Sequence, residues 1–165
     1  MTDPVMPTRG DLPTERTRMI DIHGKKATDR EAIAVGRVHL NSDAMAALIE
    51  GRLPKGDALA VARVAGIAAA KRTPELIPFC HHIPLSYVDV EFETKVEEGE
   101  VTIQATARAH APTGVEMEAL TAVSVAALTI HDMCKSIDPA AEVSQVCVVR
   151  KTGGKTGIWE RKADS

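Results

Sequence analysis

The stretch between residues 113 and 137 constrains this chain most, because it has helical periodicity and is apolar nearly all round. At 100° per residue, one stripe reads as an ordinary core face: Leu120, Val123, Ala127, Ile130, Cys134 and Ile137. The opposite side is apolar in the middle and polar or charged toward its ends: Glu118, Thr121, Val125, Leu128 and Asp132. A helix with two apolar faces is buried on both of them, so we expect a helix over 116–137 between two packed layers.

The charges at the ends of this second face require partners or a chemical role, because an unpaired buried charge is costly. Glu118 opens the face and Asp132 closes it, with Lys135 one turn further on. One interpretation is a core helix whose terminal charges reach solvent, where an Asp–Lys pair at this spacing is a common stabiliser. The other is an active site at a contact between chains. The pattern alone leaves both open.

Composition excludes several classes of protein. With 165 residues, the chain is long enough for one domain with a substantial core. A net charge of -3 gives no attraction to DNA or to an acidic membrane surface, and an aromatic content of 2% argues against a base-stacking platform. Three cysteines without a disulfide-framework spacing, and the lack of an apolar signal-like run, favour a reduced, cytoplasmic protein.

The periodicity predicts an α+β fold. Four segments read as strands: 31–40, 87–96, 101–109 and 143–151. Three segments read as helices: 42–49, with Ser42 as the N-cap, then 57–72 and 116–137. Merging the two early helices gives the ferredoxin-like split βαβ plan, one sheet with helices packed on one face. We expect a disordered tail over 1–17, a single domain over 18–157 and a C-terminal tail over 158–165.

The predicted helix 57–72 is rich in alanine and contains Gly66, so another backbone can approach it closely. Helices on one face of a sheet normally have a polar outer side, but 57–72 and 116–137 are apolar there as well. This surplus of apolar surface predicts a homo-oligomer.

The loop over 76–85 holds Cys80 and His81 between two prolines, which stiffen it. Three functions are open for it: a metal site, a nucleophilic Cys80 activated by a histidine, and a histidine that hydrogen-bonds a substrate. Adjacent Cys and His do not readily chelate one metal, and no second ligand pair stands at zinc spacing, so we expect no metal. A histidine that hydrogen-bonds a polar ligand agrees best with this sequence. The alternative without a functional role is a rigid connector with a buried thiol.

Two basic turns are candidates for binding phosphate. The tail over 151–157 is similar to a phosphate loop but fails as a Walker A motif, because Val149 stands where the first glycine is required. Lys151 and Lys155 still offer point charges there, although for Lys155 a solvated, flexible end is the favoured interpretation. In the turn over 51–57, Lys55 lies between Pro54 and Gly56, which define its position.

Three segments together resemble the cyclic pyranopterin monophosphate synthase family of molybdenum cofactor biosynthesis. They are GDALAVARVAGIAAAKRTPELIPFCH over 56–81, TGVEMEALTAVSVAALTIHDMCK over 113–135 and KTGGKTG over 151–157. The likeness spans roughly residues 19–157. One departure is His82, where the family usually has proline after Cys-His.

The resemblance implies a ferredoxin-like enzyme that assembles as a hexamer, a trimer of dimers. It converts 3′,8-cyclo-7,8-dihydro-GTP into cyclic pyranopterin monophosphate and releases pyrophosphate, without a metal or other cofactor. The family's active-site aspartate falls on Asp132, and lysines important for function fall on Lys55, Lys135 and Lys151. Its substrate contacts fall on six further positions: Phe79, Cys80, His81, Glu116, Met117 and Glu118.

The residues agree with that chemistry. The rearrangement needs several proton transfers, which lysines and carboxylates can supply, and we expect Asp132, Lys55 and Lys135 in acid and base roles. Expelling pyrophosphate needs cations on the triphosphate, for which Lys55, Lys151 and either Arg30 or Arg108 are candidates. Two rival functions are compatible with the sequence: a regulatory ligand-binding module of the same fold, and a purely structural oligomeric subunit.

Overall fold

The structure is a computed structural model that describes residues 17–155 and 157–162. The predicted N-terminal tail therefore lies outside the described residues, except for its last residue. The chain forms strands and helices in this order: β1 (Thr28–His39), α1 (Ser42–Ile49), α2 (Ala58–Ala70), α3 (Thr73–Leu76), β2 (Tyr87–Lys95), β3 (Glu100–Ala111), α4 (Glu116–Cys134), β4 (Glu142–Thr152) and β5 (Trp159–Glu160). A single 3-10 turn, η2 (Val96–Glu98), links β2 to β3.

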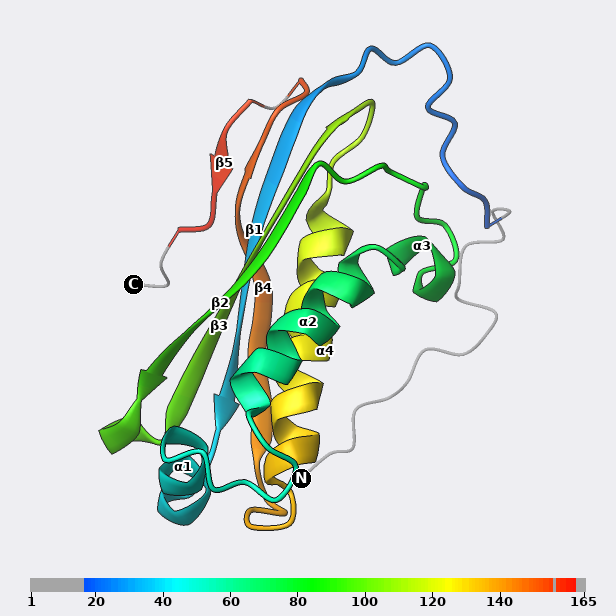
Figure 1. Cartoon of the computed structure of the whole chain (residues 1–165). Coiled ribbons are helices and arrows are strands. Elements are labelled where there is room, and N and C mark those ends of the chain that lie inside the picture. The colour runs from blue at the N-terminus through cyan, green and yellow to red at the C-terminus, as the bar shows by residue number, and fades with distance from the viewer. Residues whose placement is uncertain (1–16, 156, 163–165) are drawn as a thin grey trace, which may run out of the picture.

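The strands form one antiparallel sheet in the order β2-β3-β1-β4-β5, and α2 and α4 cover one face of it (Figure 1). The first four strands and these two helices have the split βαβ arrangement, so the predicted ferredoxin-like α+β fold is confirmed. In β3 the odd-numbered residues from Val101 to Ala111 are buried, and the even-numbered ones face the uncovered side. This alternation is the period of two that the sequence showed.

Alanine and glycine allow α2 and α4 to pack closely. A Cβ atom placed on Gly66 of α2 would lie 2.9 Å from the backbone oxygen of Ala122 on α4 and 3.4 Å from the Cβ of Ala126. The close neighbour predicted for the alanine-rich helix is therefore α4 of the same chain. α4 is long and apolar enough to cross a membrane by length and composition alone, but it packs against both α2 and the sheet.

Several boundaries differ from the prediction. Asn41, not Ser42, caps α1, because its side-chain oxygen accepts from the amide of Ala44 at 2.9 Å. α4 ends at Cys134 rather than Ile137. α3 and β5 were not predicted. Pro74 lies at the start of α3, where a missing N–H is tolerated.

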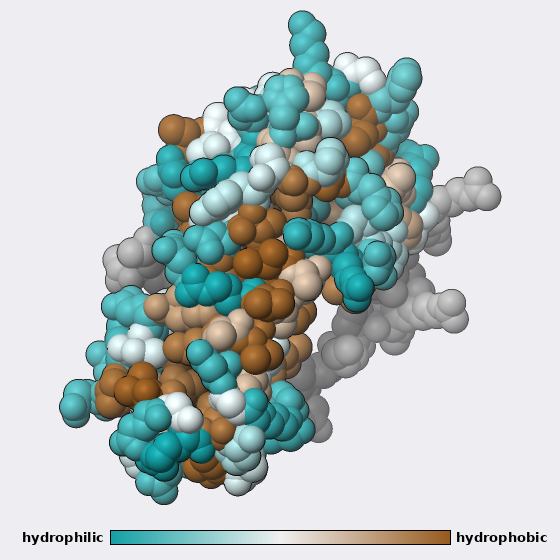
Figure 2. Space-filling view, viewed as in Figure 1, coloured by the Kyte–Doolittle hydropathy of each residue, from teal (hydrophilic) through white to brown (hydrophobic). Residues whose placement is uncertain are grey.

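Part of the helical face remains apolar and exposed. Val64 on α2 is 68% exposed and Leu128 on α4 is 60% exposed. Figure 2 shows hydrophobic residues running along the middle of the face on which α2 lies in front of α4. The predicted second apolar face of the long helix is thus covered only in part within one chain: Glu118 and Thr121 are buried, while Leu128 reaches solvent.

Candidate active site

Asp132 lies near the C-terminal end of α4 between two lysines. Its Oδ1 accepts from Lys135 Nζ at 2.7 Å and its Oδ2 accepts from Lys55 Nζ at 2.5 Å. The hydrogen bonds from Lys135 and then Lys55 lower the pKa of Asp132 to about 2. All three side chains are about half exposed. The arrangement is a permanently ionised carboxylate that orients two ammonium groups toward solvent.

The turn before α2 delivers Lys55 to this carboxylate. Leu53 is buried and anchors the turn, and Gly56 donates a backbone hydrogen bond to its carbonyl at 3.0 Å. Gly56 has a φ of 95°, which favours glycine, so the defined position predicted for Lys55 has a structural basis. Asp132 is 77 residues further along the chain, and only the packing of α2 beside α4 brings the two together.

At the opposite end of α4, Cys80 lies over the buried Glu118. The Cys80 thiol donates to Glu118 Oε1 at 3.7 Å, and Oε2 has no partner among the described residues. Glu118 is only 2% exposed, and burial raises its pKa. Burial, and then the charge of Glu118, also raise the pKa of Cys80. A raised thiol pKa lowers the fraction of thiolate, which argues against the nucleophilic role considered for Cys80.

A hollow of about 330 Å³ opens above this pair, between the loop after α3 and the start of α4. It is lined by Phe79, Cys80, His81, Ile83, Thr113, Gly114, Glu116 and Met117. Five of the six substrate contacts implied by the resemblance thus share one hollow, and the sixth, Glu118, lies directly beneath Cys80. Residues 76–85 and 113–118 are far apart in sequence, and the fold brings them together.

Glu116 is held by Lys151, whose Nζ lies 2.8 Å from Glu116 Oε1. Lys151 is on β4 and points to the helix-covered side of the sheet. Arg30 on β1 lies near it and donates from Nε to the carbonyl of Ala111 at 3.1 Å. A Cβ on Gly154 would lie 2.2 Å from Arg30 Nη1, so the glycine-rich turn packs closely against this arginine.

A larger hollow of about 650 Å³ adjoins the same end of the sheet. Its charged lining is entirely basic: Lys25, Lys26, Arg30 and Lys155. It shares Thr113 and Gly114 with the hollow above Cys80. Lys25 and Lys26 were not identified from the sequence, although a lysine pair just before a strand was a usable signal. The site has a strongly cationic side suited to phosphate groups.

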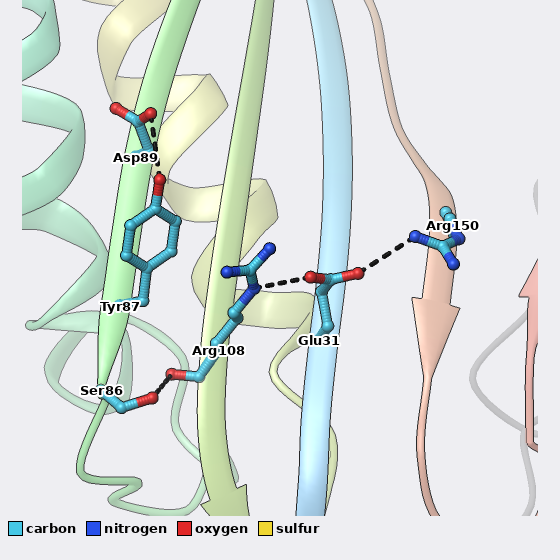
Figure 3. A network of polar contacts seen from close by, with 6 residues as sticks. All are labelled: Glu31, Ser86, Tyr87, Asp89, Arg108 and Arg150. Carbon is cyan, nitrogen blue, oxygen red and sulfur yellow. Dashed lines mark hydrogen bonds and ion pairs between the residues drawn. The ribbon is translucent and has the colours of Figure 1, made fainter.

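Arg108, the alternative to Arg30, lies on the other face of the sheet. It is part of a polar network on the uncovered side (Figure 3). Arg108 Nε lies 2.6 Å from Glu31 Oε2, and the guanidinium stands 4.9 Å from the centre of the Tyr87 ring. Arg150 Nη1 holds the other oxygen of Glu31 at 3.2 Å. The network ties β2, β3, β1 and β4 together and does not face the hollow above Cys80.

The two charged groups lie at opposite ends of one helix. Glu116 and Asp132 are the first and the third-last residues of α4, and at 1.5 Å per residue they are about 24 Å apart. The structure therefore brings together Lys55, Asp132 and Lys135, and separately Phe79 to His81, Glu116 to Glu118 and Lys151. Within one chain it does not unite the two groups around a single small molecule.

No group of three or more His, Cys, Asp or Glu side chains lies close enough to hold a metal ion within the part of the chain that the structure describes. The expectation of a reaction without metal or other cofactor stays a prediction.

Comparisons with known proteins cover most of the chain. A sequence model of the MoaC family matches residues 19–154. The chain is 53% identical over 144 residues to a protein of Chloroflexus aurantiacus, covering 87% of this chain and 88% of the relative. It is 50% identical to proteins of Pelotomaculum thermopropionicum (90% of this chain, 88% of the relative) and Geobacter metallireducens (89% and 92%). All three relatives carry the name cyclic pyranopterin monophosphate synthase.

Proposed function

The chain belongs to the MoaC family, and we propose on this premise that it catalyses the formation of cyclic pyranopterin monophosphate in molybdenum cofactor biosynthesis. The substrate is 3′,8-cyclo-7,8-dihydro-GTP, and pyrophosphate leaves as the cyclic phosphate closes, which makes the enzyme a phosphorus–oxygen lyase of the cytoplasm. The single observation that carries the proposal is the Lys55–Asp132–Lys135 cluster, because its two lysines and its carboxylate match the demand for proton transfers.

We assign the roles from geometry. Asp132, ionised at any working pH, holds Lys55 and Lys135 in place and keeps their ammonium groups on one side of the substrate. The two lysines are the acid and base candidates. Phe79, Cys80 and His81 contact the ring system from one side of the hollow. Glu116, Met117 and Glu118 contact it from the start of α4, where Lys151 fixes Glu116.

The triphosphate occupies the basic side of the site. When pyrophosphate leaves, negative charge develops on the leaving oxygen and on the phosphoryl group in transfer. Arg30 is fixed on that side by its hydrogen bond to Ala111, whereas Arg108 is engaged on the opposite face of the sheet. Arg30 and Lys151 are therefore the residues we assign to the phosphates, with Lys25 and Lys155 beside them.

A complete site requires two chains. The about 24 Å between the ends of α4 exceeds what one small substrate can bridge while contacting both groups closely. We propose that the Lys55–Asp132–Lys135 cluster of one chain faces the Cys80–Glu118 hollow of a second. The exposed apolar side chains on α2 and α4 supply area for such contacts, and a hexamer built as a trimer of dimers accommodates them.

Direct turnover tests the function. The purified protein, incubated with 3′,8-cyclo-7,8-dihydro-GTP, should release pyrophosphate and an equal amount of a pterin, followed by a coupled phosphate assay and by fluorescence after oxidation. GTP that has not been cyclised is the control and should give neither product. The activity should survive dialysis against a strong chelator. Tight binding of the cyclised substrate without turnover would support the regulatory module instead.

A further inference from the structure

The segment that precedes β1 passes the loop after α3 and binds the ring of His81. The carbonyl oxygen of Ile20 lies 2.8 Å from His81 Nε2. Residues 17–22 have no regular secondary structure, and Figure 1 draws them in dark blue. This contact is the only hydrogen bond that joins residues 17–23 to the hollow above Cys80 among the described residues.

The chemistry of the two atoms fixes the ring proton. A carbonyl oxygen has no hydrogen and can only accept, so Nε2 must carry the proton that this contact requires. In the neutral ring, Nδ1 then has the free lone pair. No other hydrogen bond of the His81 ring is found in the described part of the chain, which leaves Nδ1 free to meet a ligand.

The same segment also builds a wall. A second hollow of about 300 Å³ lies between it and the loop, lined by Arg18, Ile20, Ile22, Lys25, Phe79, His81 and Thr113. Phe79, His81 and Thr113 also line the hollow above Cys80, so the two spaces meet at His81. The ring therefore stands at a junction whose outer side is formed by the segment.

We propose that residues 17–23 are a positioning element for the active site: the Ile20 carbonyl holds His81 as the Nε2–H tautomer and presents Nδ1 to the substrate. The inference rests on the proposed function for its kinetic consequence, but the tautomer is a property of the protein alone. Ile20 itself is 70% exposed and is not part of the core, so its side chain contributes little to folding. The backbone contact accounts for the position of the segment better than burial does.

The tautomer can be read directly. The experiment uses full-length protein with ¹⁵N-labelled histidine rings, at a pH where the rings are neutral. Long-range ¹H–¹⁵N correlation spectra should show that His81 is protonated on Nε2. The chain has six histidines, and a His81→Gln variant identifies the correct signals. A His81 ring protonated on Nδ1 would overturn the proposal, whatever the enzyme assay shows.

Making residues 19–21 flexible tests whether the segment positions His81 for catalysis. In full-length protein, Met19→Gly, Ile20→Gly and Asp21→Gly combined should give a mixture of tautomers and lower kcat/KM on the order of ten- to 100-fold. Val96→Gly, at an exposed position of η2, is the control and should change neither measurement.

An unchanged tautomer and unchanged kcat/KM in the triple variant would overturn the proposal. If no variant or wild type turns over the substrate but the tautomer shifts as expected, the proposed function fails and the positioning role stands.

Discussion

Single residues at the two ends of α4 are placed in opposite environments. Asp132 is half exposed and ion-paired with two lysines, which hold its pKa at about 2. Glu118 is buried with one oxygen unpartnered, and burial raises its pKa. Two carboxylates with pKa values pushed in opposite directions can serve as a fixed anion and as a proton donor. This contrast gives each residue a separate test.

Lys135→Ala should lower kcat by about 10²- to 10⁴-fold, the usual contribution of an acid or base group. Asp132→Asn should also lower kcat, because Lys55 and Lys135 lose the carboxylate that holds them in place. Both side chains are half exposed, so the fold and the oligomeric state should be retained. Steady-state kinetics with circular dichroism and sedimentation measure these outcomes. Near-normal turnover in both variants would reduce the cluster to a surface ion pair.

Glu118→Gln should alter how stability depends on pH. Because folding raises the pKa of Glu118, the folded chain holds more proton than the unfolded chain between the two pKa values. The free energy of unfolding therefore falls as pH rises through that window. Glutamine removes this loss, so the stability of the variant relative to wild type should increase as pH rises from acid to neutral.

Urea titrations over a pH series, at one protein concentration, measure the Glu118 effect. Asp132→Asn is the control of opposite sign. The lowered pKa of Asp132 contributes stability above its unfolded value that is lost as pH falls toward about 2. Parallel stability curves for wild type and Glu118→Gln would show that the buried carboxyl does not titrate as inferred.

At the scale of elements, the contact between α2 and α4 depends on glycine. Gly66→Ala gains about 1 kcal/mol of helix propensity but places a methyl group 2.9 Å from a backbone oxygen of α4. A backbone oxygen cannot rotate away, and overpacking costs about 1–3 kcal/mol, so packing should win and the variant should be less stable. The exposed Ala68→Gly, on the same helix, should lose about 1 kcal/mol through propensity alone. Denaturant unfolding compares them, and a more stable Gly66→Ala would contradict the close packing.

At the scale of the whole molecule, a site shared between chains allows complementation. Lys135→Ala damages the cluster, and His81→Ala damages the hollow, so each variant alone should be inactive. If the site is shared as proposed, one of the two sites in a mixed dimer combines the intact cluster with the intact hollow. Equal mixing, after dissociation and reassembly, should therefore restore about a quarter of wild-type activity.

A lack of complementation would contradict the shared site. If both groups acted within one chain, no mixture would contain an intact site, and activity would stay at the level of the separate variants. Val64→Glu, which charges an exposed apolar position of α2, should weaken assembly in sedimentation experiments and lower activity with it.

Local sequence patterns were enough to predict the main elements and the layers of the fold. Alternation at residues 87–96 and 101–109 predicted the hairpin, which was confirmed. The two-faced helix predicted burial on both sides, and within one chain its second face is covered only in part. These features depend on neighbours within a few residues, because side chains repeat every two residues along a strand and every 3.6 residues along a helix. The errors lie at the ends of elements, such as the cap of α1 and the end of α4. There a single hydrogen bond determines at which residue the helix begins or ends.

Which charged residues meet depends on long-range packing and could not be predicted from local patterns. Strand register pairs Arg108 with Glu31 and Arg30 with Ala109, and residues directly opposite share a face, so the two arginines point to different sides of the sheet. The contacts of Lys55 with Asp132, Cys80 with Glu118 and Ile20 with His81 likewise join residues far apart in the chain. Local periodicity carries no information about such pairs, because their distances are set by how whole helices and strands pack.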